Sequence, residues 1–235
     1  MYHDIVTIDD KMSGFQNESA FQYKVEEDAF EEQVKALQGK DVVFTFDDGG
    51  MSFLTKAAPI LEKYGRKGIF FISTKYINTP GFLSTEQVRE LAIRGHVIGS
   101  HSHTHPDIFT RLSKEEIIQE WAMSSAVLSE ILERPISTAS IPNGYGSKEI
   151  LDAAIEQGYQ SIYTSQPTTR TTPYRGSEVI GRYVVHDSMT TFDVLRLVTS
   201  RGYQLKMSFK WHLLNLVKKV LGNSYDPIKA KLLHK

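Results

Sequence analysis

The sequence predicts an α/β fold, a distorted (β/α) barrel of about seven parallel strands followed by a basic helical C-terminal extension. Two observations predict it. Short β-branched and aromatic runs alternate with longer amphipathic stretches, which is typical of parallel β/α units. The chain has 235 residues, and single barrel domains commonly reach about 250. An open parallel sheet built from the same units is the alternative.

Six short runs are expected to be strands because they are rich in β-branched and aromatic residues. Along the chain these runs cover residues 41–46, 68–73, 96–100, 136–141, 159–163 and 179–185. The stretch 164–176 is rich in Thr, Pro and Arg, so we expect it to be a loop.

Helices are expected in the stretches between the strands. They cover residues 51–64, 84–94, 113–134, 147–157 and 190–201. Two of them open with a capping-box pattern, Ser84 to Gln87 and Ser113 to Glu116, in which the first and fourth residues satisfy each other's backbone N–H groups. Gly95 and Gly158 are expected to end two of these helices.

The C-terminal segment differs in composition from the rest. From Lys206 to Lys235 there are seven lysines and one acid, Asp226. Apolar residues recur at helical spacing beside the lysines, so we divide the chain into a main domain of residues 1–203 and a basic amphipathic helical tail of residues 204–235. One interpretation packs this helix on the domain, and the other gives it peripheral contact with a membrane surface or partner.

Composition excludes several classes of protein. With 27 basic and 28 acidic residues, the chain as a whole lacks the basic surface of a nucleic-acid-binding protein. It has no cysteine, which excludes disulfides, thiolate metal sites and a cysteine nucleophile. No signal peptide pattern or apolar run of membrane-spanning length is present. We therefore expect a cytoplasmic or membrane-peripheral protein as the chain stands, and an extracytoplasmic one if a leader was removed.

Two adjacent carboxylates directly follow the first predicted strand. Asp47 and Asp48 stand at its carboxyl end, where parallel α/β folds place catalytic loops. Because neighbouring side chains diverge, one acid can bind a cation while the other stays free as a base. A turn that uses Asp48-Gly49 is the simpler explanation of this motif when it is taken alone.

A histidine cluster follows the third predicted strand. His101 and His105 are four residues apart, so both imidazoles project from one face of a helical turn, whereas His103 points away. Zinc is commonly held by two histidines and a carboxylate, with a fourth position open to water. The acid pair and the histidines together therefore predict a metal site.

These two motifs, in this order, resemble those of the NodB-homology polysaccharide deacetylases, which form carbohydrate esterase family 4. The resemblance rests on Thr45-Phe46-Asp47-Asp48-Gly49 and His101-x-x-x-His105-Pro106, and it spans roughly residues 40 to 190. It implies a distorted β/α barrel. The implied activity is metal-dependent hydrolytic N-deacetylation of an N-acetylated amino sugar in a polysaccharide or glycan, with release of acetate.

The resemblance also implies roles for individual residues. Asp47 corresponds to the catalytic base of the family. Asp48, His101 and His105 correspond to the ligands of one divalent metal ion, usually Zn²⁺. Bacterial members act in exopolysaccharide, cell-wall or surface-glycan pathways, so we expect a bacterial protein with a carbohydrate substrate and no nucleic acid partner.

The third family motif, Arg-x-Pro-x-Gly, is altered in this chain. The matching stretch runs from Ser140 to Gly144, so Ser140 stands where the family has the Arg that orients the catalytic Asp. How Asp47 is held is therefore open. The backbone N–H of Asn143 is expected to help stabilise the oxyanion, although Pro-Asn-Gly is also a simple turn sequence.

The general acid has two candidates. Tyr2-His3-Asp4-Ile5 resembles the poly-N-acetylglucosamine deacetylase branch, in which a Tyr-His motif upstream of the acid pair supplies the acid, and this favours His3. His186 is the alternative, because it lies nearest the late position at which many members carry a histidine.

Two other functions also remain open. The chain could be a non-catalytic carbohydrate-binding relative, an alternative that Ser140 motivates. It could instead be an amidase that removes another acyl group from a lipid- or nucleotide-linked sugar, because such an enzyme would use the same metal centre.

Overall fold

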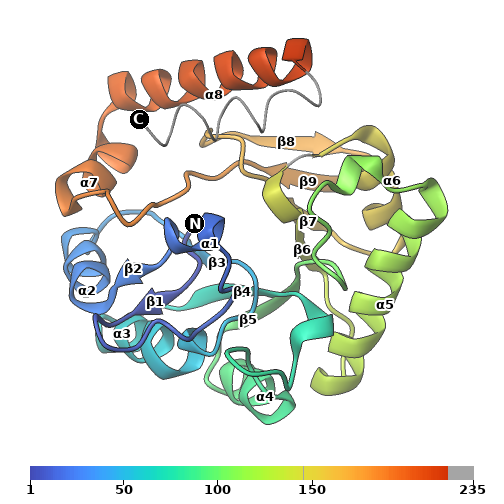
Figure 1. Ribbon diagram of the computed structural model, residues 1–235, viewed down its shortest axis with the longest axis horizontal. Coiled ribbons are helices and arrows are strands. Elements are labelled where there is room, and N and C mark those ends of the chain that lie inside the picture. Colours follow the sequence, from blue (N-terminus) through green and yellow to red (C-terminus); the bar gives the residue numbers. More distant parts are fainter. Residues whose placement is uncertain (145, 222–235) are drawn as a thin grey trace.

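A curled seven-stranded sheet forms the centre of the molecule (Figure 1). The computed structural model describes residues 1–144 and 146–221, with the side chains of the last helix described as far as residue 213. The strand order is β3-β4-β5-β6-β7-β9-β8. The strands are β3 Phe44–Phe46, β4 Gly68–Ile72, β5 Val97–Ser100, β6 Thr138–Ser140, β7 Ser161–Tyr163, β8 Thr171–Tyr174 and β9 Ser177–Ile180.

The predicted barrel-like α/β fold is confirmed, with one strand of opposite direction. Six neighbouring strands are parallel, whereas β8 pairs antiparallel with β9. The expectation of a loop over residues 164–176 was wrong at β8. This strand lies at the sheet edge and is largely exposed, so it lacks the alternation of apolar residues that marks a half-buried strand. Pro173 fits such an edge position.

Helices cover the outside of the sheet (Figure 1). They are α1 Glu18–Phe21, α2 Glu27–Ala36, α3 Ala58–Lys63, α4 Thr85–Ile93, α5 Lys114–Leu132, α6 Lys148–Glu156, α7 Thr191–Thr199 and α8 Arg201–Leu221. Both predicted capping boxes are present, at Ser84 and Ser113. The helix expected over residues 51–64 begins with a π-helical turn, Phe53–Ala57, because Pro59 has no N–H to donate to the preceding turn.

The amino-terminal residues lie between β3 and the segment that follows β9, and they close the barrel there. The Tyr2 N–H donates to the Thr45 carbonyl (2.8 Å), and the Asp47 N–H donates to the Tyr2 carbonyl (3.1 Å), so this segment runs parallel to β3. On its other side, the Val185 N–H donates to the Met1 carbonyl (2.9 Å). The buried Tyr2 ring packs 5.0 Å from the Phe30 ring, between centroids. This pairing sets His3 beside Asp47.

Beyond Tyr2 the chain forms a small two-stranded sheet. Strand β1 (Ile5–Val6) pairs in parallel with β2 (Val25–Glu26). At the other end of the chain, α7 and α8 occupy the region where we expected one helix and the start of the basic tail. The division at residues 203 and 204 falls in the first turn of α8, and residues 222–235 of the predicted tail lie outside the described residues.

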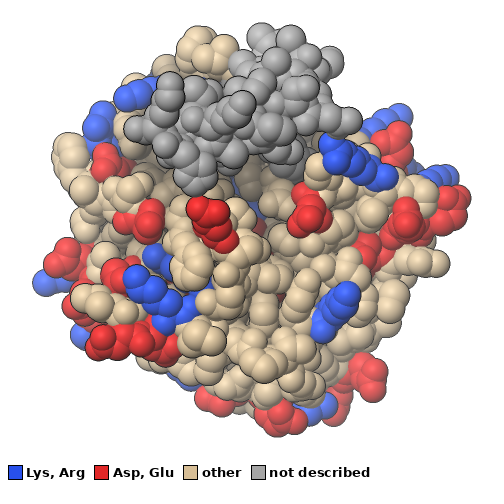
Figure 2. Space-filling view, viewed as in Figure 1, with Lys and Arg blue, Asp and Glu red and all other residues tan. Residues whose placement is uncertain are grey.

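Charged side chains of both signs are mixed on the face shown in Figure 2, in keeping with the net charge of −1. In the described part of the chain, no helix is both long enough and apolar enough to cross a membrane.

Gly99 in β5 offers a test of how closely the sheet interior is packed. A Cβ atom at this position would lie 2.6 Å from the Phe71 ring and 2.9 Å from the Thr138 methyl group. We expect Gly99→Ala to lower the free energy of unfolding by about 1–3 kcal/mol. Gly202→Ala is the matched control, since its Cβ would meet nothing within 4 Å. Urea denaturation of both variants measures the difference, and an equally stable Gly99→Ala variant would contradict this packing.

Candidate functional site

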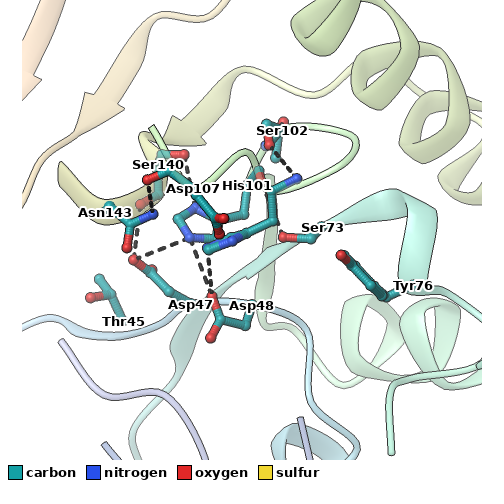
Figure 3. Close-up of polar contacts among 12 residues, drawn as sticks. Thr45, Asp47, Asp48, Ser73, Tyr76, His101, Ser102, Asp107, Ser140 and Asn143 are labelled. Carbon is teal, nitrogen blue, oxygen red and sulfur yellow. Dashed lines mark hydrogen bonds and ion pairs between the residues drawn. The ribbon is translucent and has the colours of Figure 1, made fainter. Parts of the chain in front are cut away.

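The candidate site lies at the carboxyl ends of β3, β5 and β6, which belong to four consecutive strands of the sheet, β3-β4-β5-β6 (Figure 3). Asp47 and Asp48 follow β3, His101 follows β5, and Ser140 ends β6. Parallel strands place their carboxyl ends at one edge, so residues that are far apart in sequence converge there.

Asp48, His101 and His105 form a compact cluster of potential metal ligands. One ligand atom from each lies within 4.8 Å of the others. Asp48 Oδ1 is 3.4 Å from His101 Nε2 and 3.3 Å from His105 Nε2. Burial by itself would raise the pKa of Asp48, but contacts with the two histidines outweigh it and hold the pKa well below its usual range. A buried, ionised carboxylate between two imidazoles is a suitable donor set for a divalent cation.

The loop that carries the two histidines is not the helical turn expected from their spacing. Ser102 (φ 62°) and His105 (φ 54°) both have left-handed backbone conformations, which turn the chain back on itself. The Ser102 hydroxyl accepts the His105 N–H (3.1 Å). The two imidazoles therefore meet through a local turn, and their spacing of four residues predicts their proximity but not its cause.

Glu120 of α5 holds this loop against the domain. Its carboxylate accepts the N–H groups of His103 and Thr104, both at 2.8 Å, and the Thr104 hydroxyl at 2.6 Å. Sequence reasoning did not identify Glu120, because its position in a long helix gives no sign of its contacts. The His103 ring hydrogen-bonds the Thr74 hydroxyl (2.8 Å) and is not part of the ligand cluster.

A backbone contact orients the His101 ring. Its Nδ1 lies 2.9 Å from the Ser140 carbonyl oxygen, which can only accept a hydrogen bond. Nδ1 therefore carries a proton, and Nε2 faces Asp48. Such outer contacts fix both the tautomer and the orientation of histidine ligands in metal sites.

Asp47 is buried and paired with Arg182. The guanidinium donates two hydrogen bonds to the carboxylate, from Nη1 to Oδ1 at 2.7 Å and from Nη2 to Oδ2 at 2.8 Å. The Ser140 hydroxyl donates to Oδ2 at 3.0 Å and accepts from Arg182 Nη2 at 2.6 Å. Burial alone would raise the pKa of Asp47, but Arg182 and then His101 outweigh it and lower the pKa to about 2. Asp47 is therefore ionised at neutral pH.

Arg182 is the site residue that sequence reasoning missed. It follows β9 and reaches back to β3, and its guanidinium carbon lies 5.3 Å from the Phe71 ring centroid and 5.6 Å from the Tyr163 ring centroid. Arg182 therefore holds Asp47 although Ser140 replaces the arginine of the third family motif. The guanidinium comes from the segment after β9 instead of from the end of β6. The one sequence signal was an arginine inside the strand predicted over residues 179–185, and such a position is too common to identify a role.

His3 lies beside Asp47 and Asp48, because the preceding residue, Tyr2, pairs with Phe46 at the end of β3. Its Nδ1 is buried and has no hydrogen-bond partner among the described residues. Burial lowers the pKa of His3, and the negative charges of Asp48 and Asp47 partly oppose this effect. The Tyr23 ring contacts both histidines that are candidates for the general acid. Its centroid lies 4.6 Å from that of His3 and 5.0 Å from that of His186.

Asn143 lies in a short 3-10 turn, Pro142–Gly144, and has a left-handed backbone (φ 57°). Its side-chain amide donates to the Asp107 carbonyl (3.1 Å). The turn interpretation of this motif is therefore right, while the role of the Asn143 N–H in stabilising an oxyanion stays a prediction.

Three partly exposed aromatic rings adjoin the ligand cluster. The Phe15 ring lies 5.0 Å from the His105 ring and makes edge contacts with Tyr76 and Phe82. Tyr76 and Phe82 stack on each other at 4.9 Å. These rings form an apolar wall next to His105.

Comparisons with known proteins agree with the resemblance in the motifs. The family model described as "Polysaccharide deacetylase" matches residues 35–162. The chain is 33% identical over 135 residues to YxkH of Bacillus subtilis (strain 168), whose name refers to the same family, covering 57% of this chain and 48% of YxkH. It is 25% identical over 133 residues to the peptidoglycan-N-acetylmuramic acid deacetylase PdaA of the same organism, covering 54% of this chain and 47% of PdaA.

Among solved structures, the Streptococcus pyogenes deacetylase PplD in complex with acetate aligns with a TM-score of 0.69 at 22% identity. The alignment covers 84% of this chain and 96% of PplD, and it establishes a shared fold. The chain spans about half the length of the two curated relatives described above.

Proposed function

Because the chain belongs to the polysaccharide deacetylase family, we propose that it removes acetyl groups from N-acetylated amino sugars of a polysaccharide or glycan by metal-dependent hydrolysis. One observation carries the proposal. The buried, ionised Asp47 is held by Arg182 next to a cluster of three potential metal ligands, and metal-assisted amide hydrolysis uses a base beside the metal.

The donor set fits one divalent cation, and we propose Zn²⁺. Two imidazole nitrogens and one carboxylate match the ligands of catalytic zinc sites, and the hydrogen bond on His101 Nδ1 leaves its Nε2 free to bind. Asp48, His101 and His105 would hold the ion. When bound, the metal polarises the acetamide carbonyl and increases the acidity of water.

The chain's own residues supply the proton transfers. Asp47 accepts a proton from the water that attacks the acetamide carbon, and Arg182 keeps Asp47 ionised and oriented for this role. The Asn143 N–H stabilises the negative charge that develops on the carbonyl oxygen. His3 donates a proton to the nitrogen as the C–N bond breaks, which leaves acetate and a free amine.

Two further observations support a carbohydrate substrate. The apolar wall of Phe15, Tyr76 and Phe82 next to His105 offers aromatic surfaces against which the C–H face of a sugar ring can pack. PdaA is named for the removal of acetyl groups from N-acetylmuramic acid, and the PplD structure is a complex with acetate, which is the product of this reaction.

The reaction is tested by incubating the zinc-loaded protein with N-acetylglucosamine oligomers and measuring acetate and free amine. Equal amounts of both products are expected. A metal-loaded protein that releases no acyl group from any amino sugar would contradict the proposal and favour a binding function. The binding function was considered because Ser140 replaces the arginine that orients the catalytic Asp. Arg182 supplies a guanidinium contact to Asp47, so Ser140 no longer favours that alternative. Release of a different acyl group would identify the amidase alternative.

His3 is expected to act as the general acid, and a pH profile can test this role. Because burial lowers the pKa of His3 from 6.5, its protonated fraction falls as the pH rises through a value below 6.5. Activity that needs this proton therefore decreases toward alkaline pH. We expect His3→Gln to lower kcat by about 10²-fold or more and to remove this alkaline decrease, with unchanged metal content.

His186→Gln is the matched control for His3→Gln. The His186 ring lies against the same Tyr23 ring, so the two exchanges disturb similar surroundings. We expect the control to keep the alkaline decrease in kcat. Loss of the decrease in the His186 variant alone would assign the acid to His186.

A further inference from the structure

The exposed face of α8 carries large apolar side chains. Leu205, Phe209 and Leu213 have exposed fractions of 63%, 71% and 49%. They are four residues apart and so form one stripe along the helix. The side chains of Tyr203 and Trp211, in contrast, are partly buried. A helix that packs on a domain normally turns its polar side outward, so this outward apolar stripe lacks a partner among the described residues.

Positive charge accompanies the stripe. Lys206 and Lys210 are exposed and directly follow Leu205 and Phe209 in sequence, so they flank the stripe. No Asp or Glu occurs between Asp193 and Asp226, whereas six Lys and Arg residues do. A surface that complements this helix must be negatively charged and must accept apolar side chains.

The neighbouring helix α7 also has an exposed apolar side chain next to a basic one. Phe192 is 66% exposed, and the Arg196 guanidinium lies over its ring at 5.5 Å. Helices α7 and α8 lie together on the outside of the barrel (Figure 1). Both helices therefore carry exposed apolar side chains.

We propose that the outer face of α8, defined by Leu205, Lys206, Phe209, Lys210 and Leu213, binds the surface of an anionic membrane. Apolar side chains enter the boundary between headgroups and acyl chains, while the lysines attract the negative headgroups. A second copy of the chain is a poorer occupant, because facing copies would bring the same lysines together. The inference is independent of the proposed deacetylase activity.

Vesicle sedimentation with the full chain tests the proposal. One set of vesicles is phosphatidylcholine alone, and in the other about a third of the lipid is phosphatidylglycerol. We expect at least about tenfold stronger binding to the anionic vesicles, and weaker binding as salt is raised. Equal binding to both sets, or none to either, would overturn the proposal.

Variants separate vesicle binding by α8 from nonspecific vesicle binding by other exposed apolar residues. Leu205→Gln with Phe209→Gln, and separately Lys206→Glu with Lys210→Glu, should each lower binding to anionic vesicles about tenfold or more. Ile93→Gln is the matched control, because Ile93 is an 85% exposed apolar residue on α4, and it should bind normally. Unchanged circular dichroism shows that the fold is intact. Unaffected binding by both double variants would refute the role of α8.

Light scattering tests whether a second copy of the chain binds to this face of α8. We expect a monomer at the concentrations used for vesicle binding. A dimer that the Leu205 and Phe209 exchanges dissociate, together with absent vesicle binding, would overturn the proposal and assign the face to a second copy of the chain.

Discussion

Replacing Asp47 with Asn is expected to lower kcat for acetate release by about 10³-fold or more, while the zinc content stays unchanged. Asn keeps the size and polarity of the side chain but cannot accept the proton of the attacking water. Asp47 lies outside the ligand cluster of Asp48, His101 and His105, so the metal should remain. Acetate release by single-turnover kinetics and elemental analysis of the same sample measure both effects.

His101→Ala is the counterpart of this variant. It removes one ligand of the cluster and should lose both metal and activity. The pair of variants separates the base from the metal site. Substantial activity in the metal-depleted His101→Ala protein would refute the assigned ligands, and normal turnover by Asp47→Asn would refute the assigned base.

Replacing Arg182 with Met is expected to lower kcat by about 10²-fold or more and to move the acid limb of the pH profile upward. Without the guanidinium, burial dominates and raises the pKa of Asp47 from about 2. A base must be ionised, so activity is then lost at a higher pH as the solution is acidified. The pH dependence of kcat/KM, measured with zinc-loaded protein, reports this shift.

Two further variants keep the Arg182 test interpretable if Arg182→Met unfolds, since removing one partner of a buried ion pair costs about 3–5 kcal/mol. Arg182→Lys keeps the charge but loses the paired geometry, so its kcat should lie between that of the unchanged protein and that of Arg182→Met. Ser140→Ala removes one hydrogen bond to Asp47 and should lower kcat by less than about tenfold. An unchanged acid limb in folded Arg182→Lys and Arg182→Met proteins would refute the role of Arg182.

The local features of the fold could be predicted from the sequence. The capping boxes at Ser84 and Ser113 join residues three positions apart, and the strand runs are continuous in the chain. The acid pair and the histidines could be identified because each follows a strand, and parallel strands bring such positions together. The left-handed residues Ser102 and His105 show the limit of this reasoning, since only the folded loop revealed how the imidazoles meet.

The sequence by itself therefore determined the α/β class, most of the elements and the set of potential ligands, because these depend on periodicity and on neighbouring residues. Only the tertiary structure decided how Asp47 is held, because its partner Arg182 is 135 residues away and no local pattern encodes that contact. The position of His3 likewise depends on the pairing of Tyr2 with β3, which closes the barrel. Contacts between distant segments follow from how the sheet curls, and this is a property of the folded chain as a whole.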